Sequence, residues 1–281
     1  MRFSEKISAA AQTNNSWLCV GLDPDIGKLP DHLKSDPGAI LKFNKAIIDA
    51  TADLVCAYKP NSAFYESLGR DGWSVLFETI KAVPDYIPVI LDFKRGDIGN
   101  TAAMYAKSAY EILGVDAVTV SPYMGNDSIK PFTDYADKGV FVLCLTSNPS
   151  AVEIQKQLLS KENDDISDPS MVYHHMAGLA LKWNRNKNIG LVVGATSPDE
   201  LKEIRDIIDD DMPILIPGIG AQGGDLEQSI ANGSNSNGQM AIINIARGVI
   251  YADYSERFAE KAREAAQNYQ QNIAKFSGKK R

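Results

Sequence analysis

Short apolar runs recur along the chain, and they contain few polar positions and many β-branched residues. Eight runs of this kind cover residues 17–22, 54–60, 87–94, 115–121, 139–147, 189–196, 212–220 and 240–248. Such a run, without alternation of polar and apolar positions, is typical of a parallel strand that is buried on both faces. The pattern therefore predicts eight buried strands.

Between these runs, apolar residues return at the spacing of amphipathic helices. The clearest helical segments are residues 39–54, 100–114, 198–210 and 255–276. Strand and helix thus alternate along all 281 residues. An α/β chain with eight such units favours a single (β/α)8 TIM barrel domain over residues 1–281, with an open doubly wound sheet as the alternative.

Two polar stretches and the C-terminal end interrupt this alternation. Residues 160–170 are acidic and polar, and residues 231–239 consist mainly of Asn, Gly and Ser. We expect both to be solvated insertions in the barrel. The basic end of the chain, residues 277–281, is expected to be a frayed terminus.

Composition and charge narrow the classes of partner. Hydrophobic residues make up 44% of the chain and charged residues 23%, as in an ordinary globular protein. The net charge of -7 argues against broad contact with nucleic acid or an anionic membrane. A single anionic group of a small ligand could still be held by an arginine and backbone amides.

The cysteines and the N-terminus indicate a cytoplasmic protein. Cys19, Cys56 and Cys144 are an odd number, lie in separate apolar runs, and are expected to be buried thiols rather than disulfides or metal ligands. Glu5 and Lys6 stand where a signal peptide would need apolar residues. No run approaches the ~20 apolar residues of a membrane span.

The ends of the predicted strands carry an unusual number of charges. In a (β/α)8 barrel the active site lies at the C-terminal ends of the strands. The polar residues at those ends are Asp23, Lys59, Asp92, Lys94, Asp97 and Ser147. Side chains two apart on a strand share a face, so Asp92 and Lys94 should point together and Leu91 and Phe93 the other way.

A purely structural role is available for some of these residues. Asp23 could form a turn before Pro24, Lys59 could lie on the surface, and Asp97 could cap the next helix with Thr101 one turn further. A structural role is hard to assign to the whole set at three successive strand ends, which consists of Asp23, Lys59, Asp92 and Lys94. The combination predicts one active site.

A second candidate site lies in the sequence "PGIGAQGGD". Gly218, Gly220 and Gly223 have the G-x-G-x-x-G spacing of dinucleotide-binding loops, but no acidic residue follows between 228 and 252 to bind a ribose. Barrels often bind phosphate with the loops after strands seven and eight. Glycine-rich backbone amides and Arg247 therefore predict a phosphate site.

Taken together, the motifs "LDFKRGDIGNT", "PGIGAQGGD", "GLDPD" and "ARG" resemble the orotidine 5'-phosphate decarboxylase family over about residues 20–250. The resemblance implies a homodimeric enzyme that needs no cofactor and no metal. Its reaction would convert orotidine 5'-monophosphate to UMP and carbon dioxide, the last step of de novo UMP synthesis.

The resemblance also implies residue roles. Lys94 matches the proton donor to C6 of the pyrimidine, in a charged network with Lys59, Asp92 and Asp97. Asp97, Ile98 and Thr101 match residues that reach into the partner subunit's site. The matched substrate contacts are Asp23 and Lys59 at the ribose, Ser147 (or its neighbour Thr146) at the pyrimidine, and Pro217, Gln222, Arg247 and Gly248 toward the phosphate.

Two other functions are compatible with this pattern. Sugar-phosphate lyases related to ketogulonate-phosphate decarboxylases and hexulose-phosphate synthases share the D-x-K-x-x-D spacing, but they hold magnesium with an acidic residue where this chain has Lys59. A non-catalytic nucleotide sensor would keep the phosphate site and lose a charged residue at the strand ends. This chain has all four of those charged residues, Asp23, Lys59, Asp92 and Lys94.

Overall fold

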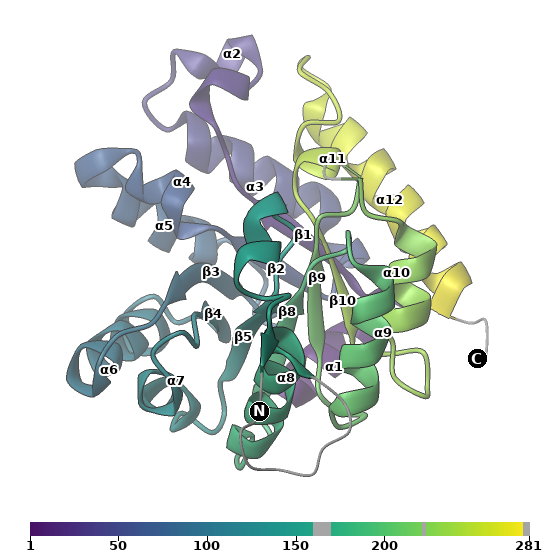
Figure 1. Cartoon of the computed structure of the whole chain (residues 1–281). Helices are drawn as coiled ribbons and strands as arrows, with labels where there is room; N and C mark the ends of the chain where they lie inside the picture. The colour runs from purple at the N-terminus through teal and green to yellow at the C-terminus, as the bar shows by residue number, and fades with distance from the viewer. Residues whose placement is uncertain (160–169, 221–222, 278–281) are drawn as a thin grey trace.

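The computed structural model describes residues 1–159, 170–220 and 223–277, and within them eight parallel strands form one barrel (Figure 1). The order around the sheet is β2-β1-β10-β9-β8-β5-β4-β3. The strands are β1 (Leu18–Leu22), β2 (Ala57–Pro60), β3 (Ile90–Arg95), β4 (Ala117–Val120), β5 (Gly139–Leu145), β8 (Ile189–Val193), β9 (Ile214–Pro217) and β10 (Ala241–Ile245). Each lies inside one of the predicted apolar runs, except that β3 extends one residue beyond its run to Arg95, which confirms that part of the prediction.

Strands β2 and β3, at the two ends of this order, close the barrel. Isolated parallel bridges join Tyr58 to Val89 and Asn61 to Asp92, and the N–H of Tyr58 donates to the carbonyl of Pro88 at 3.1 Å. These two bridges make a shorter contact than the ladder of β1 with β2 or of β4 with β5. The (β/α)8 barrel is therefore confirmed, and the alternative of an open doubly wound sheet is wrong.

The helices cover the outside of the barrel (Figure 1). The predicted helical segments correspond to α3, to α6 with a following π-turn at 108–112, to α9 and to α12. The helices of the described chain are α1 (Phe3–Thr13), α2 (Asp31–Lys34), α3 (Ala39–Thr51), α4 (Ser62–Glu66), α5 (Gly72–Lys81), α6 (Gly99–Lys107), α7 (Asn126–Thr133), α8 (Val172–Trp183), α9 (Pro198–Ile207), α10 (Leu226–Gly233), α11 (Arg247–Ile250) and α12 (Phe258–Ser277).

Helix α1, which is not among the predicted elements, packs against the N-terminal end of the barrel. Its buried face carries Phe3, Ile7 and Ala11, and these pack with inward-facing strand residues such as Phe141. The rings of Phe3 and Phe141 meet edge to face, 5.7 Å apart. Gly139 leaves room for Phe3, because a Cβ there would lie 2.4 Å from the ring. The barrel is thus filled by side chains at this end, and any ligand must enter from the other.

The polar interruptions are only partly described. Residues 160–169 and 278–281 lie outside the described residues, so the expected insertion and frayed tail stay predictions there. Leu158–Leu159 (β6) and Ser170–Met171 (β7) pair as a small antiparallel ladder beside the first of these gaps. Residues 231–239 are less solvated than expected: α10 continues to Gly233, and Ser234 and Asn235 are buried. Among the described helices, none is long and apolar enough to cross a membrane.

Candidate active site

A cavity of about 590 Å³ opens at the C-terminal ends of the strands. This volume suits a small-molecule ligand. The structure brings most of the predicted site residues to its walls: Asp23, Lys59, Asp92, Lys94, Thr146, Ser147, Pro217, Arg247 and Gly248. Gln222 lies outside the described residues.

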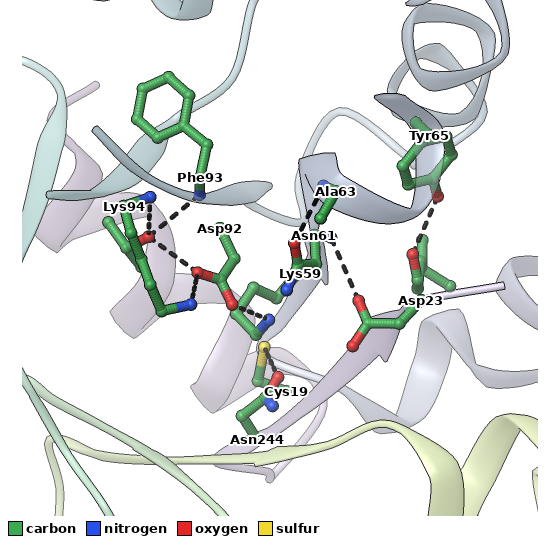
Figure 2. Close-up of polar contacts among 12 residues, drawn as sticks. Cys19, Asp23, Lys59, Asn61, Ala63, Tyr65, Asp92, Phe93, Lys94 and Asn244 are labelled. Carbon is green, nitrogen blue, oxygen red and sulfur yellow. Dashed lines mark hydrogen bonds and ion pairs between the residues drawn. The ribbon is translucent and has the colours of Figure 1, made fainter. Parts of the chain in front are cut away.

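Asp92 stands between two lysines at the centre of the site, as Figure 2 shows. Its Oδ2 accepts a hydrogen bond from Nζ of Lys59 at 2.8 Å, and its Oδ1 accepts one from Nζ of Lys94 at 2.5 Å. Lys59 is 3% exposed and Asp92 is 8% exposed, whereas the side chain of Lys94 is 45% exposed. The two buried charges pair with each other, and Lys94 presents its ammonium to the cavity.

The surroundings keep this array charged. Burial raises the pKa of Asp92, but Lys59 and Lys94 outweigh it and hold the pKa below its usual range. Burial lowers the pKa of Lys59, but Asp92 and Asp23 outweigh it and raise the pKa above its usual value. Both shifts favour the ionised pair, because each partner stabilises the other's charged form.

Strand β3 is irregular where it carries this array. Lys94 has a φ of 45°, and the pairing of β3 with β4 shifts between Leu91 and Arg95. Asp92 and Lys94 nevertheless point together, while Leu91 and Phe93 pack outside the strand layer, as predicted. Thr119 on β4 fills the gap, because its Oγ1 donates to Asp92 and accepts from the N–H groups of Phe93 and Lys94. Sequence reasoning missed Thr119, whose only signal was a hydroxyl inside an apolar run.

Further polar groups near Lys59 come from β1 and from the segments that follow β1 and β2. Oδ1 of Asp23 accepts the N–H of Asn61 at 3.1 Å, and burial raises the pKa of Asp23 while Lys59 opposes that rise. Burial also raises the pKa of the nearby Cys19 thiol to about 12, so this group stays protonated and does not act as a nucleophile. In the described parts of the chain, no group of three or more His, Cys, Asp or Glu side chains is placed to hold a metal ion.

Thr146 and Ser147 follow the end of β5, and both line the cavity. The side chain of Gln155 accepts the N–H of Thr146 at 2.7 Å and donates to its hydroxyl at 2.8 Å. That hydroxyl in turn donates to Oδ1 of Asn148 at 2.6 Å. The hydroxyl of Thr146 is therefore committed to contacts within the protein. Gln155 also lines the cavity and was missed from the sequence.

The wall of the cavity that is formed by the segments after β9 and β10 suits an anion. Gly218 and Gly220 have φ values of 102° and 72°, a backbone conformation that glycine adopts readily and that lets main-chain amides face a ligand. Arg247 starts the short helix α11, is exposed, and forms no ion pair with a residue that the structure describes. Among the described residues, therefore, no paired carboxylate competes with a phosphate for the guanidinium of Arg247.

Three predicted residues lie elsewhere. Asp97, Ile98 and Thr101 are at the start of α6 and are not among the described residues that line the cavity of their own chain. The suggestion that Asp97 caps α6 is wrong: the N-cap is Ile98, and the carboxylate of Asp97 accepts only the N–H of Ile98 there, at 2.7 Å. Ile98 is 55% exposed, and Met104 on α6 and Tyr123 in the segment after β4 are also exposed.

Comparison with known proteins agrees with this geometry. Residues 16–262 match the model of the orotidine 5'-phosphate decarboxylase / HUMPS family. An orotidine 5'-phosphate decarboxylase of Herpetosiphon aurantiacus is 52% identical over 268 residues, which are 95% of this chain and 96% of the relative. The OMP decarboxylase structure of Leishmania donovani superposes with a TM-score of 0.84 and 38% identity, covering 99% of both chains. The UMP synthase structure of the same organism gives a TM-score of 0.85 at 40% identity and covers 99% of this chain and 57% of that one.

Proposed function

The chain belongs to the orotidine 5'-phosphate decarboxylase / HUMPS family, and from that premise we propose how its cavity performs the family's decarboxylation. It converts orotidine 5'-monophosphate to UMP and carbon dioxide, a carboxy-lyase step of pyrimidine biosynthesis. The observation that supports our assignment of roles is the Lys59–Asp92–Lys94 array, which lines the same cavity as Arg247.

Lys94 is the proton donor in this proposal. Loss of carbon dioxide from C6 leaves an electron pair in the ring plane, where the pyrimidine cannot delocalise it. An ammonium fixed beside C6 attracts that growing charge more strongly in the transition state than in the bound substrate, which lowers the barrier. The same ammonium then delivers a proton to C6.

Asp92 has two roles in the proposal. It holds the ammonium of Lys94, and it lies beside the position of the substrate carboxylate. Two like charges 4 Å apart repel by about 1 kcal/mol in water and about 4 kcal/mol at a protein-like dielectric. Departure of neutral carbon dioxide relieves that repulsion, and the depressed pKa of Asp92 keeps the carboxylate ionised for it.

The other contacts orient the nucleotide. In this proposal Asp23 and Lys59 bind the ribose hydroxyls and Ser147 binds the pyrimidine, which is supported by the position of all three in the cavity wall. Arg247 binds the phosphate together with Gln222, and Pro217 and Gly248 shape the wall around them. The magnesium-dependent sugar-phosphate lyases would need an acidic residue at position 59, where this chain has a buried lysine paired with Asp92.

Arg247→Ala should weaken substrate binding much more than turnover. Removal of two charge-assisted hydrogen bonds to phosphate should raise KM by roughly 100-fold to 1,000-fold, while kcat falls by less than about tenfold. Steady-state kinetics with orotidine 5'-monophosphate measure both constants. The control is Arg257→Ala, which removes an exposed arginine paired with Glu260 and should change neither. Equal losses of kcat and of substrate affinity in Arg247→Ala would contradict this assignment.

The active unit is proposed to be a homodimer in which Asp97, Ile98 and Thr101 of one subunit complete the cavity of the other. Their position outside their own cavity supports this arrangement, as does the exposed apolar surface of Ile98, Met104 and Tyr123. A closed dimer with twofold symmetry is also the commonest assembly of soluble enzymes.

A mixing experiment tests whether Asp97 acts across the interface. Lys94→Ala and Asp97→Ala should each be inactive alone, but a mixed dimer has one cavity with an intact Lys94 and an intact Asp97. Equal amounts, dissociated and reassembled together, should recover about a quarter of wild-type activity, because half of the dimers are mixed and each has one intact site. If Asp97 serves its own cavity, no activity will return.

A cytoplasmic location is also proposed, because Cys19, Cys56 and Cys144 are all free and buried. A disulfide involving any of them in protein isolated from cells would contradict it.

The reaction itself is tested by ultraviolet absorbance. Purified protein should consume orotidine 5'-monophosphate at the same rate with and without EDTA, and Lys94→Ala serves as the blank. Binding of UMP without consumption of the substrate would indicate a nucleotide sensor instead. Consumption that EDTA stops would indicate a metal-dependent lyase.

A further inference from the structure

The hydroxyl of Thr119 uses its whole hydrogen-bonding capacity inside the charged array. A threonine hydroxyl has one donor and two acceptor lone pairs. Oγ1 donates to Oδ1 of Asp92 at 2.9 Å and accepts the N–H groups of Phe93 and Lys94, both at 3.1 Å. The residue is 1% exposed, so nothing is left over for a ligand. Any effect of Thr119 on the reaction must therefore pass through its three partners.

The backbone of β3 depends on this hydroxyl. Leu91 pairs with Val118 and Arg95 with Val120, so three residues of β3 lie opposite the single residue Thr119. In such a bulge the extra residues lose their partners in the ladder. The Thr119 hydroxyl accepts the two N–H groups of that segment and so takes the place of the missing carbonyl.

Lys94 is the residue for which this support has the greatest consequence. Its φ of 45° lies in the left-handed region, which is unfavourable for a side chain with a Cβ. Its side chain is 45% exposed, so packing does little to hold it. What fixes its ammonium is the backbone at position 94 and Oδ1 of Asp92, and the Thr119 hydroxyl contacts both.

We propose that Thr119 is a positioning residue of the decarboxylation, which sets the ammonium of Lys94 against C6 without touching the substrate. This inference rests on the proposed role of Lys94. In this inference the hydroxyl of Thr119 orients the proton donor and does not serve stability alone. A displacement of about 1 Å in a reacting group can cost on the order of 100-fold in rate.

Thr119→Val tests the proposal, because valine keeps the shape and removes all three hydrogen bonds. We expect kcat to fall by roughly tenfold to 100-fold, with KM and the affinity for UMP changed by less than about threefold. Thr119→Ser keeps the hydroxyl and should restore kcat to within about threefold of wild type. The amide protons of Phe93 and Lys94 should also exchange faster with solvent in Thr119→Val than in the wild type.

The matched control is Thr79→Val. Thr79 is equally buried, its hydroxyl accepts a hydrogen bond from Asn44, and neither residue lines the cavity. Loss of the Thr79 hydroxyl should lower the melting temperature and leave kcat unchanged. The proposal is overturned if Thr119→Val keeps wild-type kcat, or if Thr119→Ser, folded and able to bind UMP, loses kcat by more than about tenfold. An inactive wild type would instead refute the proposed reaction itself.

Discussion

Lys94→Ala is expected to lower kcat by on the order of 10⁴-fold, because it removes both the charge that stabilises the carbanion and the proton that replaces carbon dioxide. The affinity for UMP should change by less than about tenfold, since the product is held mainly by the phosphate wall. Inhibition by UMP and single-turnover absorbance separate the two effects. The fold should survive, because the side chain is 45% exposed and alanine meets the same backbone conformation.

Lys28→Ala is the control for this variant. Lys28 lines the same cavity, its side chain is 53% exposed, and it pairs with Asp25. If general positive charge in the cavity were sufficient, both lysine variants would lose activity to a similar extent. If Lys94 is the proton donor, Lys28→Ala should keep most of kcat. Turnover that persists in Lys94→Ala would contradict the proposed mechanism.

Asp92→Asn should both inactivate and destabilise the enzyme. The substitution keeps the shape of the side chain but leaves the ammonium of Lys59, 3% exposed, without its carboxylate partner. Breaking a buried pair in this way costs about 3 to 5 kcal/mol. For a chain of this size the melting temperature should fall on the order of 10 °C. Calorimetry measures this fall. The control is Asp53→Asn, which breaks an exposed pair with Arg263 and should lower the free energy of unfolding by less than about 1 kcal/mol.

The loss of stability in Asp92→Asn should depend on pH. The pKa of Asp92 is depressed in the fold, so its contribution is present above its unfolded pKa of about 3.9 and is lost as the pH falls through the folded value. The pKa of Lys59 is raised, so its contribution is present below about 10.4 and is lost as the pH rises through the folded value. The difference in free energy of unfolding between the wild type and Asp92→Asn should therefore be largest between these two pH limits. A difference that is constant into strong acid would indicate a packing defect instead.

Much of the fold was predictable because its signals are local. Each barrel strand is a short apolar run, and helices such as α3 and α12 repeat their apolar residues with a clear period. Helix α1, with its buried residues Phe3, Ile7 and Ala11, was missed because it precedes the first strand and so lies outside the alternation of strand and helix. The closure between β2 and β3 also could not be read locally, because two isolated bridges join segments about 30 residues apart.

The charged centre was predictable for a related reason. Asp92 and Lys94 lie two apart, and the regular alternation of a strand already places them together. The structure reaches that result through a bulge, which needs a hydroxyl from a neighbouring strand. Thr119 and Gln155 were missed because they contact main-chain groups, and single-sequence patterns carry no information about which backbone will lack a partner.

The two bridges between β2 and β3 make this the seam of the barrel, and the Lys59–Asp92 pair crosses it. The contact that orients the reacting charges therefore also fastens the two ends of the sheet. The same two side chains thus serve both the reaction and the closure of the barrel. A substitution of Lys59 or Asp92 that alters the reaction will therefore also alter how the barrel closes. A redesign of the reaction at these positions would first have to supply another contact that holds β2 and β3 together.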